Sequence, residues 1–287
     1  MFSDFPKKSK IKVVLPSSIL INDNTLLLKT LKMGYIFRIL SMFKINEVVF
    51  YNDGTLTNDI EFMETLMNYL KIPPYLRKST QKKENLRYAG VLSPVQTPNH
   101  IGVEVENYVY KEGIINKVTQ DEKRDNCTLE IDAGQNKPSL ITLNNQSDHQ
   151  YRKDEKIILE ISSDSTRPAI DEELEYWNTQ FLFLNAPIKD LLTEENSVNQ
   201  YIIAASRSGE NIDLNILNDL RKSLKNVERI YILFGPHKGS FRDYLNNKQI
   251  PKDLINIWLN FIPDQGTKSI RTEEALHAAL SILNILN

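Results

Sequence analysis

Residues 257–286 read IWLNFIPDQGTKSIRTEEALHAALSILNIL and join a short apolar run, a polar loop and an amphipathic segment. The apolar run predicts a strand at 257–261, and the amphipathic segment predicts a helix at 271–286. Thr272 is the expected N-cap, followed by two glutamates in the first turn, where the helix dipole favours anions. The predicted buried face of the helix consists of Leu276, Ala279, Leu280 and Leu283.

The same alternation of strand and helix extends outward to both ends of the chain. Short apolar runs closed by turn residues predict strands, and apolar residues at helical spacing predict helices between them. This order is typical of a parallel α/β sheet. The expected strands are 11–15, 47–51, 181–184, 201–206 and 229–234, and the expected helices are 25–44, 59–71 and 211–225.

The middle of the chain has a different texture. From Gly90 to about Thr166, short runs rich in valine and isoleucine alternate with turns. Such a series predicts a small closed β-barrel, for which an OB-fold is one candidate. The domains are therefore expected to be a discontinuous α/β domain, 1–89 and 167–287, and a barrel insert, 90–166. The five expected barrel strands are 102–110, 113–119, 127–133, 139–143 and 156–162.

Composition limits the class of protein. The chain has 287 residues, 41% hydrophobic and 25% charged, with a net charge of −2, so a globular fold with a sizeable core is expected. Cys127 is the single cysteine, which excludes an intramolecular disulfide. The sequence shows no secretory signal and no apolar run long enough to span a bilayer, so we expect a cytoplasmic protein. We also expect no metal, because the histidines at 100, 149, 237 and 277 lack ligand spacing.

Three glycine-containing loops follow predicted strands near the C-terminus, at 205–209, 235–239 and 262–268. Ligands of α/β proteins bind at the carboxyl ends of the strands, so three such loops together indicate a site; ordinary turns are the alternative. The segment FGPHKGS at 234–240 is not a phosphate-binding P-loop, because Lys238 precedes Gly239 and the spacing is wrong.

The run Gln265–Ala275, QGTKSIRTEEA, is the most specific motif. It resembles the end of the SPOUT (α/β-knot) putative RNA methyltransferases shared by archaea and eukaryotes. Further matches occur in the same order upstream, so that the resemblance covers about residues 11–285. They are Pro74–Lys78, Ala89–Pro94, Thr97–His100 and Tyr176–Trp177.

The resemblance implies a C-terminal trefoil knot whose loops bind S-adenosyl-L-methionine (SAM), and a homodimer formed through the knot. It implies methyl transfer to a base in structured RNA, with ribosomal RNA as a candidate substrate. Arg271 is the candidate for orienting a phosphate or base of the acceptor. Glu273 or Glu274 is the candidate for positioning Arg271 or accepting a proton; a capped helix with Arg271 in a surface salt bridge is the alternative. The implied SAM pocket consists of Ser206, Gly209, Phe234, Gly235, Gly239, Ile262, Gln265, Gly266, Thr267, Ile270 and Ala275.

An RNA substrate requires a basic surface, and residues 77–87, RKSTQKKENLR, carry five cations and one acid. A solvated helix face is the alternative reading of this run. Tyr108, Tyr110 and Tyr151 in the insert are candidates for stacking unpaired bases, and core tyrosines are the alternative. The candidate RNA-binding cations are Arg77, Lys78, Lys82, Lys83 and Arg87.

The chain departs from the pattern of the family at two places. Asn178, Thr179 and Leu182 stand where relatives have a glycine, an aromatic residue and an arginine, and Arg207-Ser208 replaces an acidic-basic pair. These changes concern the substrate side of the site. They leave open a second hypothesis, a non-catalytic RNA-binding or ribosome-assembly protein that keeps the fold.

Overall fold

The computed structural model describes residues 9–55, 59–105, 107–121, 126–135, 137–144, 150–169, 174, 176–184, 188–194 and 199–286. The chain forms two compact units. The first consists of residues 1–68, 85–92 and 179–287, and the second of residues 69–84 and 93–178. No helix within the described residues is long and apolar enough to cross a membrane.

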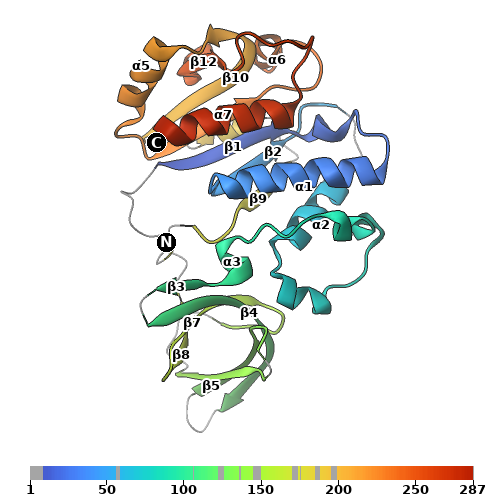
Figure 1. Cartoon of the computed structure of the whole chain (residues 1–287), viewed down its shortest axis with the longest axis vertical. Coiled ribbons are helices and arrows are strands. Elements are labelled where there is room, and N and C mark those ends of the chain that lie inside the picture. Colours follow the sequence, from blue (N-terminus) through green and yellow to red (C-terminus); the bar gives the residue numbers. More distant parts are fainter. Residues whose placement is uncertain are drawn as a thin grey trace. The chain divides into compact units, whose positions relative to one another are not determined.

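The first unit contains a parallel six-stranded sheet, as the alternation of strands and helices predicts (Figure 1). Its strand order is β12-β10-β11-β1-β2-β9, and every neighbouring pair is parallel. The sequence positions of the strands match their predicted centres. Their bounds are β1 Lys10–Pro16, β2 Glu47–Tyr51, β9 Gln180–Leu184, β10 Gln200–Asn211, β11 Arg229–Phe234 and β12 Ile257–Asn260.

Helices cover this sheet. In Figure 1, α1 (Leu26–Met42) and α7 (Thr272–Leu286) lie side by side across one face. Strand residues of alternate parity, such as Val14 and Leu233, pack in a cluster with residues of α4 (Ile188–Glu194) and α6 (Phe241–Asn247). Strands that are buried on both faces have continuous apolar sequences, so these strands could be predicted from the sequence. The remaining helices of this unit are α5, Leu214–Leu224, and most of α2, Ile60–Lys71.

The start of α7 differs from the expected cap. Arg271, rather than Thr272, occupies the cap position, since its carbonyl accepts from the backbone N–H groups of Glu274 and Ala275. The Glu274 carboxylate reaches back and accepts from the Arg271 backbone nitrogen at 2.8 Å. This return bond is half of a capping box, and it satisfies a donor that would otherwise lack a partner. The prediction of Thr272 as the cap is wrong by one residue.

Strand β10 is longer than predicted, because it contains a bulge. Both Ala205 and Glu210 lie opposite Leu259 of β12, so residues 206–209 loop out between them. At Gly209, a Cβ atom would lie 2.7 Å from the backbone of Leu259. Only glycine allows the two strands to approach this closely. The following helix, α5, consequently begins at 214 and not at the expected 211.

The second unit contains a nearly closed antiparallel sheet of order β6-β5-β4-β7-β8, with β3 paired to β4. The division of two expected strands is wrong: 102–110 is split between β3 and the start of β4, and 113–119 lies inside the same β4. Gly113, the expected first residue of the strand 113–119, lies inside β4, where a Cβ would come within 2.5 Å of Ile131. The bounds are β3 Val103–Val105, β4 Tyr108–Asp121, β5 Asn126–Asp132, β6 Ser139–Asn144, β7 Lys156–Ile161 and β8 Thr166–Pro168.

The interior of this barrel-like sheet is apolar. Ile115, Leu129, Ile131 and Leu159 are fully buried in one cluster, together with Cys127. The alternating burial along β5 places every second side chain inside, which is the pattern of a sheet with one buried face. Short helical segments precede the barrel strands, namely η2 Pro74–Ser79 and α3 Pro98–Ile101.

Candidate active site

A cavity of about 920 Å³ lies in the first unit beside strands β1, β10, β11 and β12. The four strands are neighbours in the sheet; the carboxyl ends of β1, β11 and β12 supply Pro16, Phe234 and Asn260 to the cavity wall, and β10 supplies Ala205, the residue before its bulge. The bulge of β10 and the loops that follow β11 and β12 therefore meet at one edge of the sheet, as the sequence predicts for the three glycine-containing segments. The volume is in the range of small-molecule sites.

Most of the predicted cofactor residues line this cavity, and three do not. Gly209 packs against the backbone of β12, and Gly266 and Thr267 also lie outside the lining. Thr267 instead shapes its own loop: its carbonyl accepts from Gln265 Nε2 at 2.7 Å, and its hydroxyl donates to the carbonyl of Ser269 at 3.0 Å. The predicted residues in the lining are Ser206, Phe234, Gly235, Gly239, Ile262, Gln265, Ile270 and Ala275.

One hydrogen bond ties the last of these loops to the β10 bulge. Arg207 Nη1 donates to the carbonyl of Lys268 at 3.0 Å, and both residues line the cavity. Neither was predicted to line it, although Arg207 was recognised as a departure from the family pattern. The bond fixes the spacing between two cavity walls that lie far apart in sequence.

The two candidate catalytic residues, Arg271 and Glu273, differ in their exposure and in their position relative to the cavity. Arg271 lines the cavity and its side chain is 70% exposed. Glu273 is buried and lies outside the lining, with its Oε1 4.0 Å from Arg271 Nη1. Its Oε2 is 3.3 Å from Lys32 Nζ, which is also 3.2 Å from Asp23 Oδ2. Glu273 is therefore placed to orient charged neighbours and not to touch the contents of the cavity.

The N-terminal half of the chain contributes a wall that the sequence did not reveal. Besides Pro16, this wall consists of Ser18, Ile19, Asn22, Asp23 and Lys32. The loop after β1 is held by Asp53, a buried residue just after β2, which accepts from the hydroxyls of Ser17 and Ser18. Asn22 Nδ2 lies 3.3 Å from His237 Nδ1, so this wall also reaches the β11 loop. The available signal was topological: β1 lies next to β11, and its loop must open on the same edge.

No cluster of three or more potential metal ligands occurs among the described residues. His149 lies outside the described residues.

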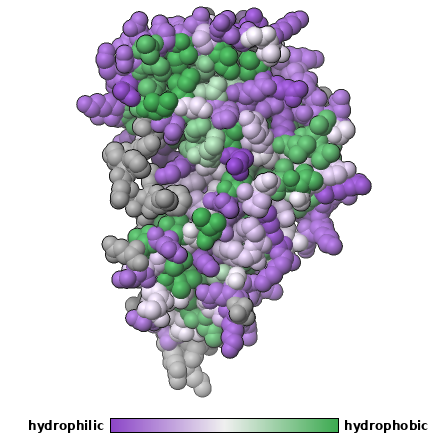
Figure 2. Space-filling model, viewed as in Figure 1, coloured by the Kyte–Doolittle hydropathy of each residue, from purple (hydrophilic) through white to green (hydrophobic). Residues whose placement is uncertain are grey.

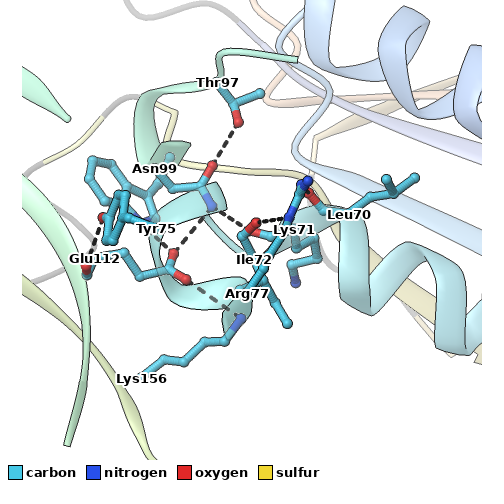
Figure 3. Close-up of polar contacts among 10 residues, drawn as sticks. Leu70, Lys71, Ile72, Tyr75, Arg77, Thr97, Asn99, Glu112 and Lys156 are labelled. Atoms are coloured by element: carbon cyan, nitrogen blue, oxygen red, sulfur yellow. Dashed lines mark hydrogen bonds and ion pairs between the residues drawn. The ribbon is translucent and has the colours of Figure 1, made fainter. Parts of the chain in front are cut away.

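The basic run 77–87 is used in part for internal bonding. Arg77 Nε donates to the carbonyl of Ile72 at 2.9 Å, and its Nη2 to that of Leu70 at 3.3 Å. Figure 3 shows this side chain directed at the end of α2. Lys78 is exposed and lies 3.3 Å from Asp132. The other three candidates of the run, Lys82, Lys83 and Arg87, are exposed.

The second unit also contains a polar cluster around the buried Glu112, which consists of Glu112, Tyr75, Asn99 and Lys156 (Figure 3) together with Trp177. Glu112 Oε2 accepts from Asn99 Nδ2 at 3.2 Å and from Trp177 Nε1 at 3.3 Å. Its Oε1 lies 3.5 Å from Lys156 Nζ, and Tyr75 donates to its backbone carbonyl at 2.8 Å. Burial raises the pKa of Glu112 above the ordinary value. These groups satisfy one another, which is the pattern of a structural network.

The three tyrosines proposed for base stacking differ in their burial. Tyr110 is half-buried and donates to Glu160 Oε2 at 2.7 Å, and Tyr151 packs against the barrel core. Tyr108 is 40% exposed. Tyr108 alone of the three is therefore placed on the surface for stacking.

The residues that depart from the family pattern fall into two groups, one at the cavity and one away from it. Arg207 and Ser208 line the cavity. Thr179 is buried and Leu182 lies on β9, at the sheet edge opposite β12. Asn178, Thr179 and Leu182 are all outside the cavity lining.

Comparison with known proteins now identifies the family. The family described as "Putative RNA methyltransferase" matches residues 10–283. The chain is 27% identical to a protein of Haloarcula marismortui, over 95% of this chain and 98% of that protein. It is 25% identical to the 28S rRNA (uridine-N(3))-methyltransferase of Drosophila melanogaster, over 98% of this chain and 63% of that enzyme. The Homo sapiens protein of the same name is 26% identical, over 95% and 77%. Because the family match covers residues 10–283, which include every residue of the cavity wall, the chain belongs to this family of RNA methyltransferases.

Proposed function

We propose that this chain transfers a methyl group from SAM to a base nitrogen in structured RNA, with ribosomal RNA as the substrate. The observation that carries the proposal is the cavity, which is lined by the bulge of β10 and by the loops after β11 and β12. Relatives that cover most of the chain are named as methyltransferases acting on N3 of a uridine in 28S rRNA. The proposal extends that chemistry, and the choice of a ribosomal base, to this chain.

The cavity has the character that SAM requires. Phe234, Ile262 and Ile270 offer apolar surface for an adenine ring, and the loops around them expose backbone groups. Ser206, Gln265 and the N-terminal wall with Asp23 and Lys32 supply polar partners for the ribose and the amino-acid part of SAM. SAM supplies an electrophilic methyl group.

The residues of the chain would then orient the acceptor and accept its proton. Methylation of a ring N–H requires loss of that proton, and Asp23 and His237 are cavity-lining groups able to accept one. Arg271, exposed at the start of α7, would hold the acceptor in line with the methyl group. Glu273 would act through Lys32 and Arg271, as a positioning residue.

The proposal includes a trefoil knot in the first unit. The strand order β12-β10-β11 supports it, as does the bond that ties the β12 loop to the bulge of β10. It also includes the division into a methyltransferase domain, 1–89 and 167–287, and an OB-like RNA-binding insert, 90–166. The nearly closed sheet of the second unit supports that insert.

The proposal further includes a homodimer. Along α1, Leu27, Leu28, Leu31 and Tyr35 form an apolar stripe that is 37–48% exposed. Figure 2 shows apolar surface over α1, at the right of the view. These residues stand at positions i, i+1, i+4 and i+8, which share one face of the helix, and an exposed apolar face of this kind supports an interface with a second copy.

Two measurements test the proposal in sequence. Titration calorimetry of the purified protein with SAM should show binding at micromolar strength, and binding should be competed by the demethylated product. Incubation with radiolabelled SAM and total RNA should then label an RNA species. Binding of SAM without label on any RNA would contradict the catalytic proposal and favour the RNA-binding assembly protein. The absence of SAM binding would contradict the assignment of the cavity.

A further inference from the structure

The walls of the cavity carry an excess of positive charge in a protein whose net charge is −2. Among the described residues that line it, the cations are Lys32, Arg207, Lys268 and Arg271, whereas Asp23 is the one carboxylate. Lys32 is almost fully buried between Asp23 and Glu273, so its charge is neutralised within the wall. Three exposed cations are left, Arg207, Lys268 and Arg271, which we call the cationic rim.

The rim is held in place by contacts that leave its charges available. Arg207 uses one nitrogen to donate to the backbone of Lys268, which keeps these two residues adjacent across 61 positions of sequence. A guanidinium has five N–H donors, so Arg207 retains others for a ligand. The Glu274 carboxylate is engaged by the backbone of Arg271, and Glu273 lies 4.0 Å from the guanidinium. The backbone N–H groups at the start of α7 add positive potential beside Arg271.

The placement of the rim suits the backbone of a nucleic acid. A base that is modified at a ring atom must leave its stack and enter a pocket, so its own phosphates stay near the mouth. Arginine binds phosphate with a planar fork, and lysine as a point charge. The run 77–87, in contrast, directs Arg77 into backbone bonds and pairs Lys78 with Asp132.

We propose that the cationic rim binds the RNA phosphates on either side of the methylated nucleotide. This inference rests on the proposed function, because it assumes that the acceptor base enters this cavity. It assigns the main electrostatic contact to the first unit, at residues distant in sequence from the basic run. Arg207, a departure from the family pattern, becomes a contact that this chain uses for substrate.

The test compares charge-removing variants in a salt titration. Fluorescence anisotropy would follow binding of a short fluorescein-labelled oligouridylate to the wild type and to the double variant R207Q/K268Q at increasing KCl. Each lost phosphate contact lowers the slope of log K against log salt by about 0.7 for a single strand, so the expected reduction is about 1.4. The affinity at low salt should fall about tenfold or more.

A matched variant controls for net charge. K222Q/K225Q removes the same two charges from α5 and its C-cap, on exposed residues outside the cavity lining. Its slope should stay close to that of the wild type. R207K, which keeps the charge but loses the fork, should retain the slope while weakening affinity. An unchanged slope in R207Q/K268Q, or an equal reduction in K222Q/K225Q, would overturn the inference.

Calorimetry with SAM separates this inference from the proposed function. K268Q alone keeps the bond from Arg207 to the backbone carbonyl of residue 268, so it should bind SAM as the wild type does and lower the salt slope by about 0.7. If K268Q loses SAM binding, the rim holds the carboxylate of the methyl donor and the inference is overturned. If the wild type binds no SAM but the slope still depends on the rim, the cofactor assignment fails while the phosphate contact is supported.

Discussion

The cavity of the first unit and the polar cluster of the second unit both gather charged side chains, but they use them differently. In the polar cluster, Glu112 is buried and each of its carboxylate oxygens faces a donor or a cation from the same unit. At the cavity, the Arg271 side chain is 70% exposed, and its guanidinium lies 4.0 Å from the Glu273 carboxylate. The bonded charges around Glu112 are typical of a group that stabilises the fold, whereas the exposed charges at the cavity are available to bind a ligand.

The largest expected effect concerns the polar cluster. Glu112→Ala leaves the buried donors of Asn99 and Trp177 and the Lys156 ammonium without their acceptor. We expect the free energy of unfolding to fall by about 3 kcal/mol. Urea unfolding measures this change. Glu104→Ala, at an exposed position of β3 in the same unit, should change it by less than about 0.5 kcal/mol. Equal effects of both substitutions would show that the cluster is not a stabilising network.

The next effect concerns the cavity and catalysis. Arg271→Ala should slow methyl transfer about 100-fold, which corresponds to about 2.7 kcal/mol, because the acceptor loses its orienting group. Single-turnover rates with radiolabelled SAM measure this change. SAM affinity and the unfolding midpoint should stay unchanged, since the side chain is exposed. Loss of SAM binding together with activity would mean that Arg271 supports the fold of the pocket.

A smaller effect separates two glycines that the same motif-based reasoning assigned to the pocket. Gly209→Ala places a Cβ 2.7 Å from the backbone of Leu259, whereas a Cβ at Gly266 meets no atom within 4 Å. Gly209→Ala should therefore destabilise the protein by about 2 kcal/mol, and Gly266→Ala by much less. Thermal unfolding of the two variants checks the difference. A well-tolerated Gly209→Ala would mean that the β10 bulge adapts easily.

The smallest effect is a dependence of stability on pH in the second unit. Burial, assisted by the positive charge of Arg77, lowers the pKa of His100 from 6.5 to about 4. Between these values the unfolded chain binds a proton that the folded chain rejects, so stability falls as the pH drops from 6.5 towards 4. His100 is buried, and acidification from pH 7 to pH 5 spans part of the interval between the two pKa values, so we expect a loss of about 1–2 kcal/mol.

Urea unfolding of the wild type and of His100→Gln near pH 7 and near pH 5 isolates this contribution. The groups that act on the ring are the side chains of Arg77 and Lys156 and the backbone of Leu70 and Lys71, and they are common to both proteins. The variant should lose less stability on acidification than the wild type. The same loss in both proteins would assign the acid sensitivity to another group.

The parallel sheet could be predicted from sequence because its strands are apolar on both faces and alternate with helices. The division of β4 could not, since Gly113 resembles a turn residue until its contact with Ile131 is known. In the cavity, the glycine-rich loops were recognisable by motif. Asp23 and Lys32 were not, because their position depends on β1 lying beside β11 and on α1 lying beside α7. These are long-range contacts that no local pattern encodes.

The cavity wall draws on residues 16–32 and on residues 205–275. During synthesis, the cavity can therefore form only after the residues of α7 have been added to the chain. Such non-local closure is slow compared with local helix formation. A bound methyl donor would contact both distant stretches, so its binding would stabilise the whole first unit and not one loop.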